Sequence, residues 1–360
     1  MKKRGRTLDQ KLDLPAMQRA LELARNGMYT TTPNPRVGCV VMKDGEAVGE
    51  GWHEKAGGPH AEVVALKRAG GDAKGATMYV SLEPCNHQGR TPPCVDAIVK
   101  AGVKRLVVAM RDPNPEASGG GERLRSAGIA LEYGLMEEEA RELNIGFISR
   151  VTRGRPWVRM KIAATLDGRT ALSNGKSQWI TGAQARRDGH RWRARACAVL
   201  TGAGTIASDD PQLTVREVET PRQPLRVIVD SRLETPPAAR ILRGEKVLVF
   251  AAKSGSLPNA EVVALPNPSG KVDLPGMLRE LAKRGVNELH VEAGPRLNSS
   301  LVREGCVDEY LIYLNPSFLG DSAQGMLDLP APGSLEERPR MSILSIERLG
   351  EDVRLVARPA

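Results

Sequence analysis

Short apolar runs in the first part of this 360-residue chain alternate with stretches whose apolar residues recur every three or four positions. The runs have the length of buried strands, and the recurring positions have the period of helices. Asp13 and Pro15 predict the start of the first helix, because aspartate caps helices and proline suits their first turn. Asp44 and Gly45 predict a hairpin turn after a strand at 37–42. Further strands are expected at 77–82, 104–110 and 129–133, and further helices at 59–69, 94–100, 121–127 and 137–151.

The rest of the chain continues this alternation, which predicts an α/β fold throughout. The stretches 253–259 and 266–276 are rich in Pro, Gly and Ser and are expected to be loops. A basic segment with Gly and Pro at 152–156 predicts the domain boundary, so we expect domains at 1–152 and 153–360. Strands are expected at 157–163, 196–201, 225–230, 246–251, 288–292, 308–314 and 353–358, and helices at 183–195 and 295–304.

Composition narrows the class of protein. Hydrophobic residues make up 41% of the chain and charged residues 26%, which is the balance of a soluble globular protein. No run of 18 apolar residues occurs, so we expect no membrane span. Five cysteines are too few for a disulfide scaffold and fit a reducing cytoplasm. The net charge of +9 favours acidic partners, and the scarcity of aromatic residues favours small phosphorylated ligands over nucleic acid.

One short segment holds a histidine, an acid and two cysteines. His60 and Glu62 lie in the first turn of one predicted helix, and Cys94 begins another. The positive ends of two helices would stabilise the thiolates that zinc needs. A catalytic zinc keeps three protein ligands and leaves the fourth position to water, whose pKa it lowers to about 7. We therefore predict that His60, Cys85 and Cys94 hold zinc, and that Glu62 carries protons.

Two alternatives stay open on the residues alone. His53 or His87 could replace His60 as a ligand, although neither has an acid two residues later at a helix start. The segment could also be part of a structural zinc ribbon or an ordinary pair of buried cysteines. A ribbon would need Cys-x-x-Cys knuckles, whereas eight residues separate Cys85 from Cys94.

The order His-Ala-Glu, Pro-Cys and a second Cys resembles the signature of zinc nucleoside and nucleobase deaminases. Its eight-residue gap between the cysteines, where two residues are usual, resembles the deaminase domain of the bifunctional riboflavin-biosynthesis deaminase/reductases. Residues 32–39 and 111–115 extend this resemblance over nearly the whole first domain. It implies a cytidine-deaminase-like three-layer α/β/α domain. It assigns zinc to His60, Cys85 and Cys94, proton transfer to Glu62 and the pyrimidine ring to Asn34.

The second domain contains Gly-Ala-Gly-Thr-Ile-Ala at 202–207 after a predicted strand, with Asp230 ending a later one. This is the outline of a dinucleotide fingerprint, but Pro211 leaves too little room for a full crossover helix. Turn glycines are the simpler interpretation. Residues 161–169, 177–181 and 291–295 instead resemble the reductase of the same bifunctional family. That resemblance implies a dihydrofolate-reductase-like α/β domain that uses NADPH.

The reductase resemblance also implies two sets of contacts. Residues 292–296 join a strand end to a helix start, where backbone N–H groups can bind a pyrophosphate. The cofactor would contact Ala163, Trp179, Thr205, Asp209, Ser231, Gly294, Pro295, Arg296, Leu297, Asn298, Ser299 and Ser300. The substrate would contact Ser177, Arg193, Leu213, Arg216 and Glu292. Four polar residues near these sites have no assigned role: Lys161, Asp210, His87 and Arg90.

We expect two fused enzymes that act in series on one phosphoribosyl pyrimidine. The first would deaminate 2,5-diamino-6-(5-phosphoribosylamino)pyrimidin-4(3H)-one by zinc-dependent hydrolysis. The second would use NADPH to reduce 5-amino-6-(5-phosphoribosylamino)uracil to the ribitylamino phosphate. We also expect a cytoplasmic homo-oligomer that binds neither nucleic acid nor membrane. The alternatives are a nucleic-acid-editing deaminase and a non-catalytic binding module stabilised by zinc.

Overall fold

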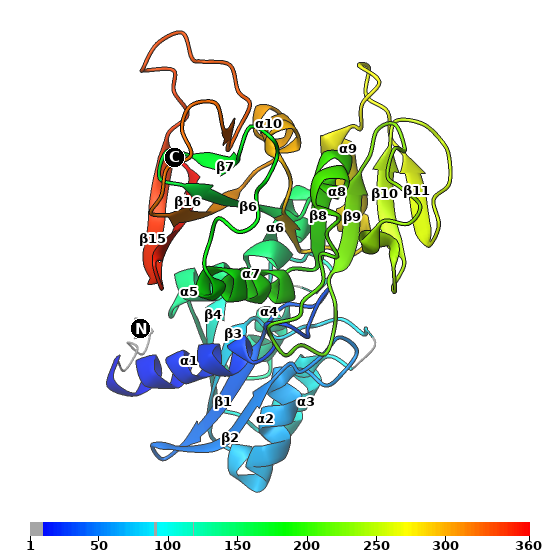
Figure 1. The fold of residues 1–360 in the computed structure, drawn as a ribbon. Coiled ribbons are helices and arrows are strands. Elements are labelled where there is room, and N and C mark those ends of the chain that lie inside the picture. Colours follow the sequence, from blue (N-terminus) through cyan, green and yellow to red (C-terminus); the bar gives the residue numbers. More distant parts are fainter. Residues whose placement is uncertain (1–9, 90–91, 118) are drawn as a thin grey trace. The chain divides into compact units, whose positions relative to one another are not determined.

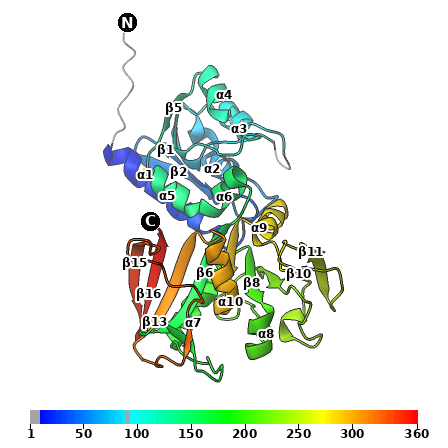
Figure 2. The ribbon, with the colours of Figure 1, turned by 90° about the horizontal axis from the view of Figure 1, so that it is seen from above.

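The computed structural model describes residues 10–89, 92–117 and 119–360. Figures 1 and 2 show helices and strands in both halves of the described chain. It divides into two compact units, one up to Arg153 and the other from Gly154. No helix in the described ranges is both long and apolar enough to cross a membrane. Each unit has a sheet and a hydrophobic core of its own.

A five-stranded sheet in the order β2-β1-β3-β4-β5 forms the centre of the first unit. β1 and β2 form the hairpin that Asp44 and Gly45 predict, and β3, β4 and β5 are parallel. α1 packs with α5 on one face of the sheet, and α2 packs with α3 on the other (Figure 1). The three-layer prediction is therefore confirmed. The elements are α1 (Gln10–Arg25), β1 (Gly38–Lys43), β2 (Glu46–Trp52), α2 (Ala61–Ala69), β3 (Thr77–Leu82), α3 (Cys94–Ala101), β4 (Arg105–Met110), α4 (Gly120–Ser126), β5 (Ala130–Tyr133), α5 (Glu137–Leu143) and α6 (Ile145–Arg153).

Two glycines bring α2 unusually close to the sheet. A Cβ atom at Gly51 would lie 2.5 Å from the carbonyl oxygen of Ala61, and one at Gly49 would lie 2.3 Å from that of Ala65. No real side chain tolerates such contacts with backbone. The glycines on β2 therefore fix where the first turn of α2, with His60 before it, meets the sheet.

Two predictions for the first unit are wrong. Asp13 does not cap α1: the helix already runs through it, and its buried carboxylate accepts hydrogen bonds from Tyr79 and Arg105. The single helix predicted at 137–151 is two helices, because the chain breaks at Asn144. The Asn144 side chain instead pairs with the backbone of Arg36, accepting from its N–H at 2.7 Å and donating to its carbonyl at 3.0 Å.

A nine-stranded sheet in the order β11-β10-β9-β8-β12-β6-β13-β16-β15 forms the second unit. The strands from β11 to β13 are parallel, and β16 and β15 are antiparallel to their neighbours. α7 contacts β12, and α8 contacts β8. The elements are β6 (Trp157–Thr165), β7 (Arg169–Ala171), α7 (Ala183–Arg195), β8 (Ala198–Gly202), α8 (Ala203–Asp209), β9 (Leu225–Val229), β10 (Val247–Ala251), β11 (Ala260–Ala264), α9 (Leu274–Lys283), β12 (Glu288–Val291), α10 (Pro295–Arg303), β13 (Glu309–Asn315), β14 (Gln324–Gly325), β15 (Met341–Leu349) and β16 (Asp352–Pro359).

The loop predicted at 266–276 is wrong at its end, where α9 begins. Asp273 caps this helix, because its carboxylate accepts a hydrogen bond from the N–H of Gly276 at 3.0 Å. Pro275 occupies the first turn, where its missing N–H costs nothing. The strands β11 and β15 were not predicted. β11 is the outer parallel strand, and β15 pairs only with β16 among the described strands.

Candidate functional sites

The predicted metal ligands meet between the starts of two helices. His60 precedes α2 in an extended conformation, Cys94 is the first residue of α3, and Cys85 lies in the loop after β3. His60 Nδ1 lies 3.1 Å from Cys94 Sγ and 3.5 Å from Cys85 Sγ. All three ligand atoms lie within 4.8 Å of one another. One imidazole nitrogen and two sulfurs at these distances fit the ligand set of a catalytic zinc.

The surroundings of the two cysteines favour a bound cation. A hydrogen bond from Cys94 and the nearby His60 lower the pKa of the Cys85 thiol to about 4. The backbone N–H of Cys94 also donates to Cys85 Sγ at 3.4 Å. The hydrogen bond between Cys94 and Cys85, burial, and the negative charges of Glu62 and Cys85 raise the pKa of Cys94, so a second thiolate is costly without a cation. A divalent cation would remove that penalty, so both cysteines suit metal binding.

Glu62 is the second residue of α2 and is 3% exposed. Burial raises the pKa of its carboxyl group, and the charge of His60 opposes that rise. Glu62 is not one of the three residues whose ligand atoms form the cluster. A buried carboxyl group that is easily protonated, beside a metal site, has the property that a proton carrier requires.

Asn34 is held by a histidine whose role the sequence did not reveal. The Asn34 side-chain nitrogen lies 3.0 Å from His53 Nε2, and His53 Nδ1 lies 3.0 Å from the carbonyl oxygen of Pro59. Burial lowers the pKa of His53, so its ring is neutral, donates to Pro59 and accepts from Asn34. Both ring nitrogens are thus engaged, and His53 is not among the clustered ligands. His87 is exposed and also outside that cluster, and Arg90 lies outside the described residues.

A cavity of about 720 Å³ opens in the second unit at the carboxyl ends of β6 and β12. Carboxyl ends of parallel strands are where α/β proteins bind ligands. The predicted contacts that line it are Ala163, Ser177, Trp179, Arg193, Thr205, Asp209, Leu213, Arg216, Glu292, Gly294, Pro295 and Asn298, together with Lys161. The predicted contacts that do not line it are Ser231, Arg296, Leu297, Ser299 and Ser300.

The carboxylate of Glu292, which lines this cavity, is held by two cationic side chains. Arg193 contacts both oxygens of Glu292, and its Nη2 lies 2.9 Å from Oε2. Lys161 Nζ lies 3.8 Å from the same Oε2. Burial alone would raise the pKa of Glu292, but the charge of Arg193 and the neighbouring donors hold it well below its usual range. Burial lowers the pKa of Lys161, and Arg193 lowers it further.

The start of α10 borders the cavity through Gly294, Pro295 and Asn298. Gly294 precedes the helix, Pro295 begins it, and the Asn298 side chain donates to the carbonyl of Ala293 at 3.1 Å. The fully buried Ser299 hydroxyl instead accepts from the N–H of Asp328 at 2.6 Å. Its side chain therefore serves the packing of the helix rather than the cavity.

The structure does not support the dinucleotide fingerprint. α8 is only seven residues long. The carboxylate of Asp230 is 2% exposed and accepts hydrogen bonds from the N–H groups of Glu234 and Thr235 and from the Thr235 hydroxyl. It therefore caps its own loop and is not available to a ribose. Asp210, which had no assigned role, accepts from the N–H of Arg240 at 2.7 Å.

His190 is a cavity residue that sequence reasoning missed. Its Nδ1 accepts a hydrogen bond from the backbone N–H of Arg216 at 3.1 Å. Burial and the charges of Arg193 and Arg216 lower its pKa to about 4, so the ring is neutral near pH 7. Nothing in the arginine-rich stretch around it distinguishes this histidine, because only the tertiary contact with Arg216 gives it a partner.

Comparison with known proteins now identifies the two units. Residues 10–110 match the cytidine and deoxycytidylate deaminase zinc-binding region, and residues 156–355 match the RibD C-terminal domain. The riboflavin biosynthesis protein RibD of Escherichia coli (strain K12) is 46% identical over 354 residues, which cover 94% of this chain and 96% of that protein. The chain belongs to the RibD family.

Other members of the RibD family agree along the full length. The RibD of Aquifex aeolicus (strain VF5) is 44% identical over 348 residues, or 95% of this chain and 97% of that one. The Acinetobacter baumannii RibD structure, form 1, superposes with a TM-score of 0.92 at 44% identity, covering 98% of this chain and all of that one. A Thermotoga maritima structure superposes at 0.90 and 35% identity, covering 98% and 100% of the two chains. The predicted family, fold class and pair of activities are therefore confirmed.

As a RibD family member, the chain is a bifunctional deaminase/reductase of riboflavin biosynthesis. Its first domain is a zinc-dependent deaminase and its second is an NADPH-dependent reductase. This pair of domains excludes the editing deaminase and the non-catalytic binding module.

Proposed function

We propose that the chain carries out two successive steps on one phosphoribosyl pyrimidine. The Thermotoga maritima protein is described as a diaminohydroxyphosphoribosylaminopyrimidine deaminase and 5-amino-6-(5-phosphoribosylamino)uracil reductase, and this chain covers its whole length. The first reaction replaces the 2-amino group of 2,5-diamino-6-(5-phosphoribosylamino)pyrimidin-4(3H)-one by oxygen and releases ammonia. The second reduces the ribosyl group of the product to ribityl. The ligand cluster beside a buried acid is the observation that most strongly supports the first step.

In the deaminase domain, His60, Cys85 and Cys94 would hold zinc. Zinc, when bound, supplies the Lewis acidity that makes water a nucleophile near neutral pH. Glu62 would take a proton from the attacking water and deliver it to the leaving amine, so one carboxyl group serves both halves of the reaction. Asn34, which His53 orients, would donate to the pyrimidine ring.

In the reductase domain, NADPH supplies a hydride. Arg193, Arg216 and Ser177 offer a cationic and hydroxyl-bearing wall that suits the ribose phosphate. Leu213 and Glu292 would complete the substrate contacts. We assign cofactor contacts to the predicted residues that line the cavity, Ala163, Trp179, Thr205, Asp209, Gly294, Pro295 and Asn298, whereas Ser231, Arg296, Leu297, Ser299 and Ser300 lie outside its lining. Asn298, which fixes the backbone at Ala293, would keep the start of α10 in the conformation that meets the pyrophosphate.

We assign residues 1–152 to the deaminase domain and 153–360 to the reductase domain, and we propose a cytoplasmic homo-oligomer. β15 lies at the outer edge of its sheet, and its Ile343, Leu344 and Ile346 side chains are 58%, 51% and 65% exposed. An apolar strand at an open edge is suited to pairing with another strand. A second copy of β15 is the partner we propose. Sedimentation should show a smaller assembly for Ile346→Lys than for the unmodified chain.

One assay tests the two activities together. Purified protein is mixed with the diaminopyrimidine substrate and NADPH, and ammonia release and NADPH oxidation are followed with and without a zinc chelator. We expect both signals without the chelator and neither with it. The aminouracil, supplied directly, should restore NADPH oxidation in the presence of the chelator. Ammonia release that survives complete zinc removal contradicts the proposed first step.

A further inference from the structure

One face of β12 carries polar side chains where a central parallel strand normally carries apolar ones. Glu288, His290 and Glu292 alternate with Leu289 and Val291, which belong to the hydrophobic core on the opposite face. β12 pairs with β8 along one edge and with β6 along the other, and α7 contacts it. Buried polar groups are retained where partners or a function compensate them.

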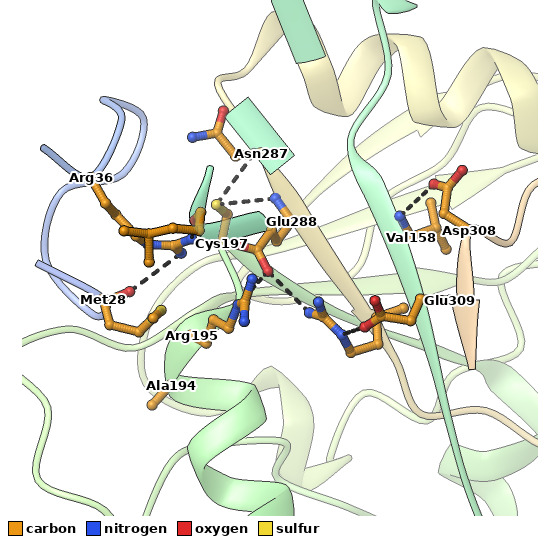
Figure 3. A network of polar contacts seen from close by, with 12 residues as sticks. Met28, Arg36, Val158, Ala194, Arg195, Cys197, Asn287, Glu288, Asp308 and Glu309 are labelled. Atoms are coloured by element: carbon orange, nitrogen blue, oxygen red, sulfur yellow. Dashed lines mark hydrogen bonds and ion pairs between the residues drawn. The ribbon is translucent and has the colours of Figure 1, made fainter. Parts of the chain in front are cut away.

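Both acids of this face have cationic partners. Glu288 accepts from Arg159 at 3.0 Å and from Arg195 at 2.7 Å. Figure 3 labels Glu288, Arg195 and Glu309 in this network. Glu292 is held by Arg193, as described above. The two ends of the polar face are therefore compensated by charge.

His290, between them, is the exception. Its side chain is fully buried, and it lies beside Arg159 in the register of β6 and β12. Within the part of the chain that the structure describes, neither ring nitrogen makes a hydrogen bond of ordinary geometry. Its Nε2 lies 3.4 Å from Glu292 Oε1, the oxygen of the cavity carboxylate that also meets Arg193. His290, which does not line the cavity itself, thus contacts Glu292, which does.

The charges around His290 keep the ring neutral. Burial lowers its pKa, Glu292 opposes this, and Arg193 and Arg159 lower it further. A neutral imidazole has one N–H to donate, so the Nε2–H tautomer would offer that proton to Glu292. The charged groups on the strands and helix around it are Arg159 and Lys161 on β6, Arg193 and Arg195 on α7, and Glu288 and Glu292 on β12 with its carboxyl end.

We propose that His290 is a positioning residue of the reductase, whose neutral Nε2–H directs the Glu292 carboxylate toward the substrate. This rests on the proposed contact between Glu292 and the substrate. Arg193 reaches Glu292 from the cavity side, and Lys161 is close enough to Oε2 to draw the carboxylate aside. A second donor at Oε1 resists that movement and stabilises the ionised form. Losing it would misplace the carboxylate and raise its pKa.

Two substitutions separate this role from packing. His290→Leu fills the space without a donor, whereas His290→Gln restores an N–H near the Nε2 position. We expect Leu to raise the KM for the aminouracil about tenfold, because the polar contact of the ring with the Glu292 carboxylate is lost, with a smaller effect on kcat. The acidic limb of its kcat/KM profile should move to higher pH, and Gln should stay close to the unmodified chain. Equal effects of Leu and Gln, or no effect of either, overturn the proposal.

Three further measurements keep the test decisive. Ammonia release in the same variants reports whether the deaminase domain is intact. Calorimetry measures the affinity for the aminouracil with NADP⁺ present, and equal affinities in all three proteins contradict the role of His290. Absent turnover in the unmodified chain is a different failure, which contradicts the proposed reduction itself. Nitrogen NMR of the five histidines, with the Gln variant assigning the signal, should show a neutral Nε2–H ring for His290. A charged ring or the Nδ1–H tautomer overturns the proposal even if a variant fails to fold.

Discussion

Glu62 of the deaminase domain and Glu292 of the reductase domain are both buried acids, but their surroundings act in opposite directions. Burial raises the pKa of Glu62, and the charge of His60 opposes that rise only in part. Arg193 contacts both oxygens of Glu292 and holds its pKa far below the usual range. The first carboxyl group can gain and lose a proton during turnover, whereas the second is a fixed negative charge. A proton carrier and a binding group thus require different environments around the same side chain.

The first test of this comparison removes the proton carrier. Glu62→Gln should lower the rate of ammonia release by about a thousandfold, within the range for losing a general acid–base group. Zinc content should stay near one ion per chain, because His60, Cys85 and Cys94 remain. Metal analysis checks the zinc, and NADPH oxidation with added aminouracil is the internal control. Turnover that survives the substitution would exclude Glu62 as the proton carrier.

The second test compares the stability effects of the two acids. Glu292→Gln should destabilise the reductase domain by about 3 kcal/mol, because it leaves the charge of Arg193 buried without its partner. Glu62→Gln should not destabilise its domain, because it removes a buried charge that burial disfavours. Urea unfolding followed by tryptophan fluorescence reports mainly the reductase domain, which contains three of the four tryptophans. Equal destabilisation by the two substitutions would contradict the comparison.

The third test removes Arg193, a cationic partner of Glu292. Arg193→Ala should raise the KM for the aminouracil about tenfold to a hundredfold, because a charge-assisted contact with the substrate and the support of Glu292 are both lost. Arg187→Ala, at an exposed position of the same helix, is the matched control and should leave KM unchanged. Steady-state kinetics with saturating NADPH distinguish the two variants. An unchanged KM in Arg193→Ala would count against its role.

The smallest effect concerns pH. The pKa of His190 is about 4 in the folded chain, below the usual value near 6.5, so the unfolded chain binds more protons between these values. Stability of the reductase domain therefore falls as pH drops from 6.5 to 4. His190→Asn keeps an acceptor for the Arg216 N–H but cannot be protonated. We expect it to remove about 2 kcal/mol of that loss, measured by urea unfolding at several pH values. An identical pH dependence in both proteins would contradict the burial of a neutral ring.

The two sites also differ in how much of each could be predicted. The three ligands and Glu62 lie between positions 60 and 94, and their helix-start settings are visible as local patterns. The reductase cavity draws side chains from Lys161 to Met326. Family resemblance supplied most of its residues, but no local pattern indicated His190 or His290. Each of these histidines has a role only because a distant segment supplies its neighbour: the N–H of Arg216 for His190, and Arg159 on β6 for His290.

The same three residues, Asp-Leu-Pro, occur at 13–15 and at 273–275, and they separate what sequence determines from what tertiary structure decides. By itself the sequence determined the alternation of strands and helices, the segment that holds the candidate zinc ligands and the family, because these depend on neighbours along the chain. At Asp273 the local rule holds and the carboxylate caps α9. At Asp13 the side chains of Arg105 and Tyr79 bind the buried carboxylate instead. A strong partner brought close by the fold outweighs a cap, which contributes only about 1 kcal/mol.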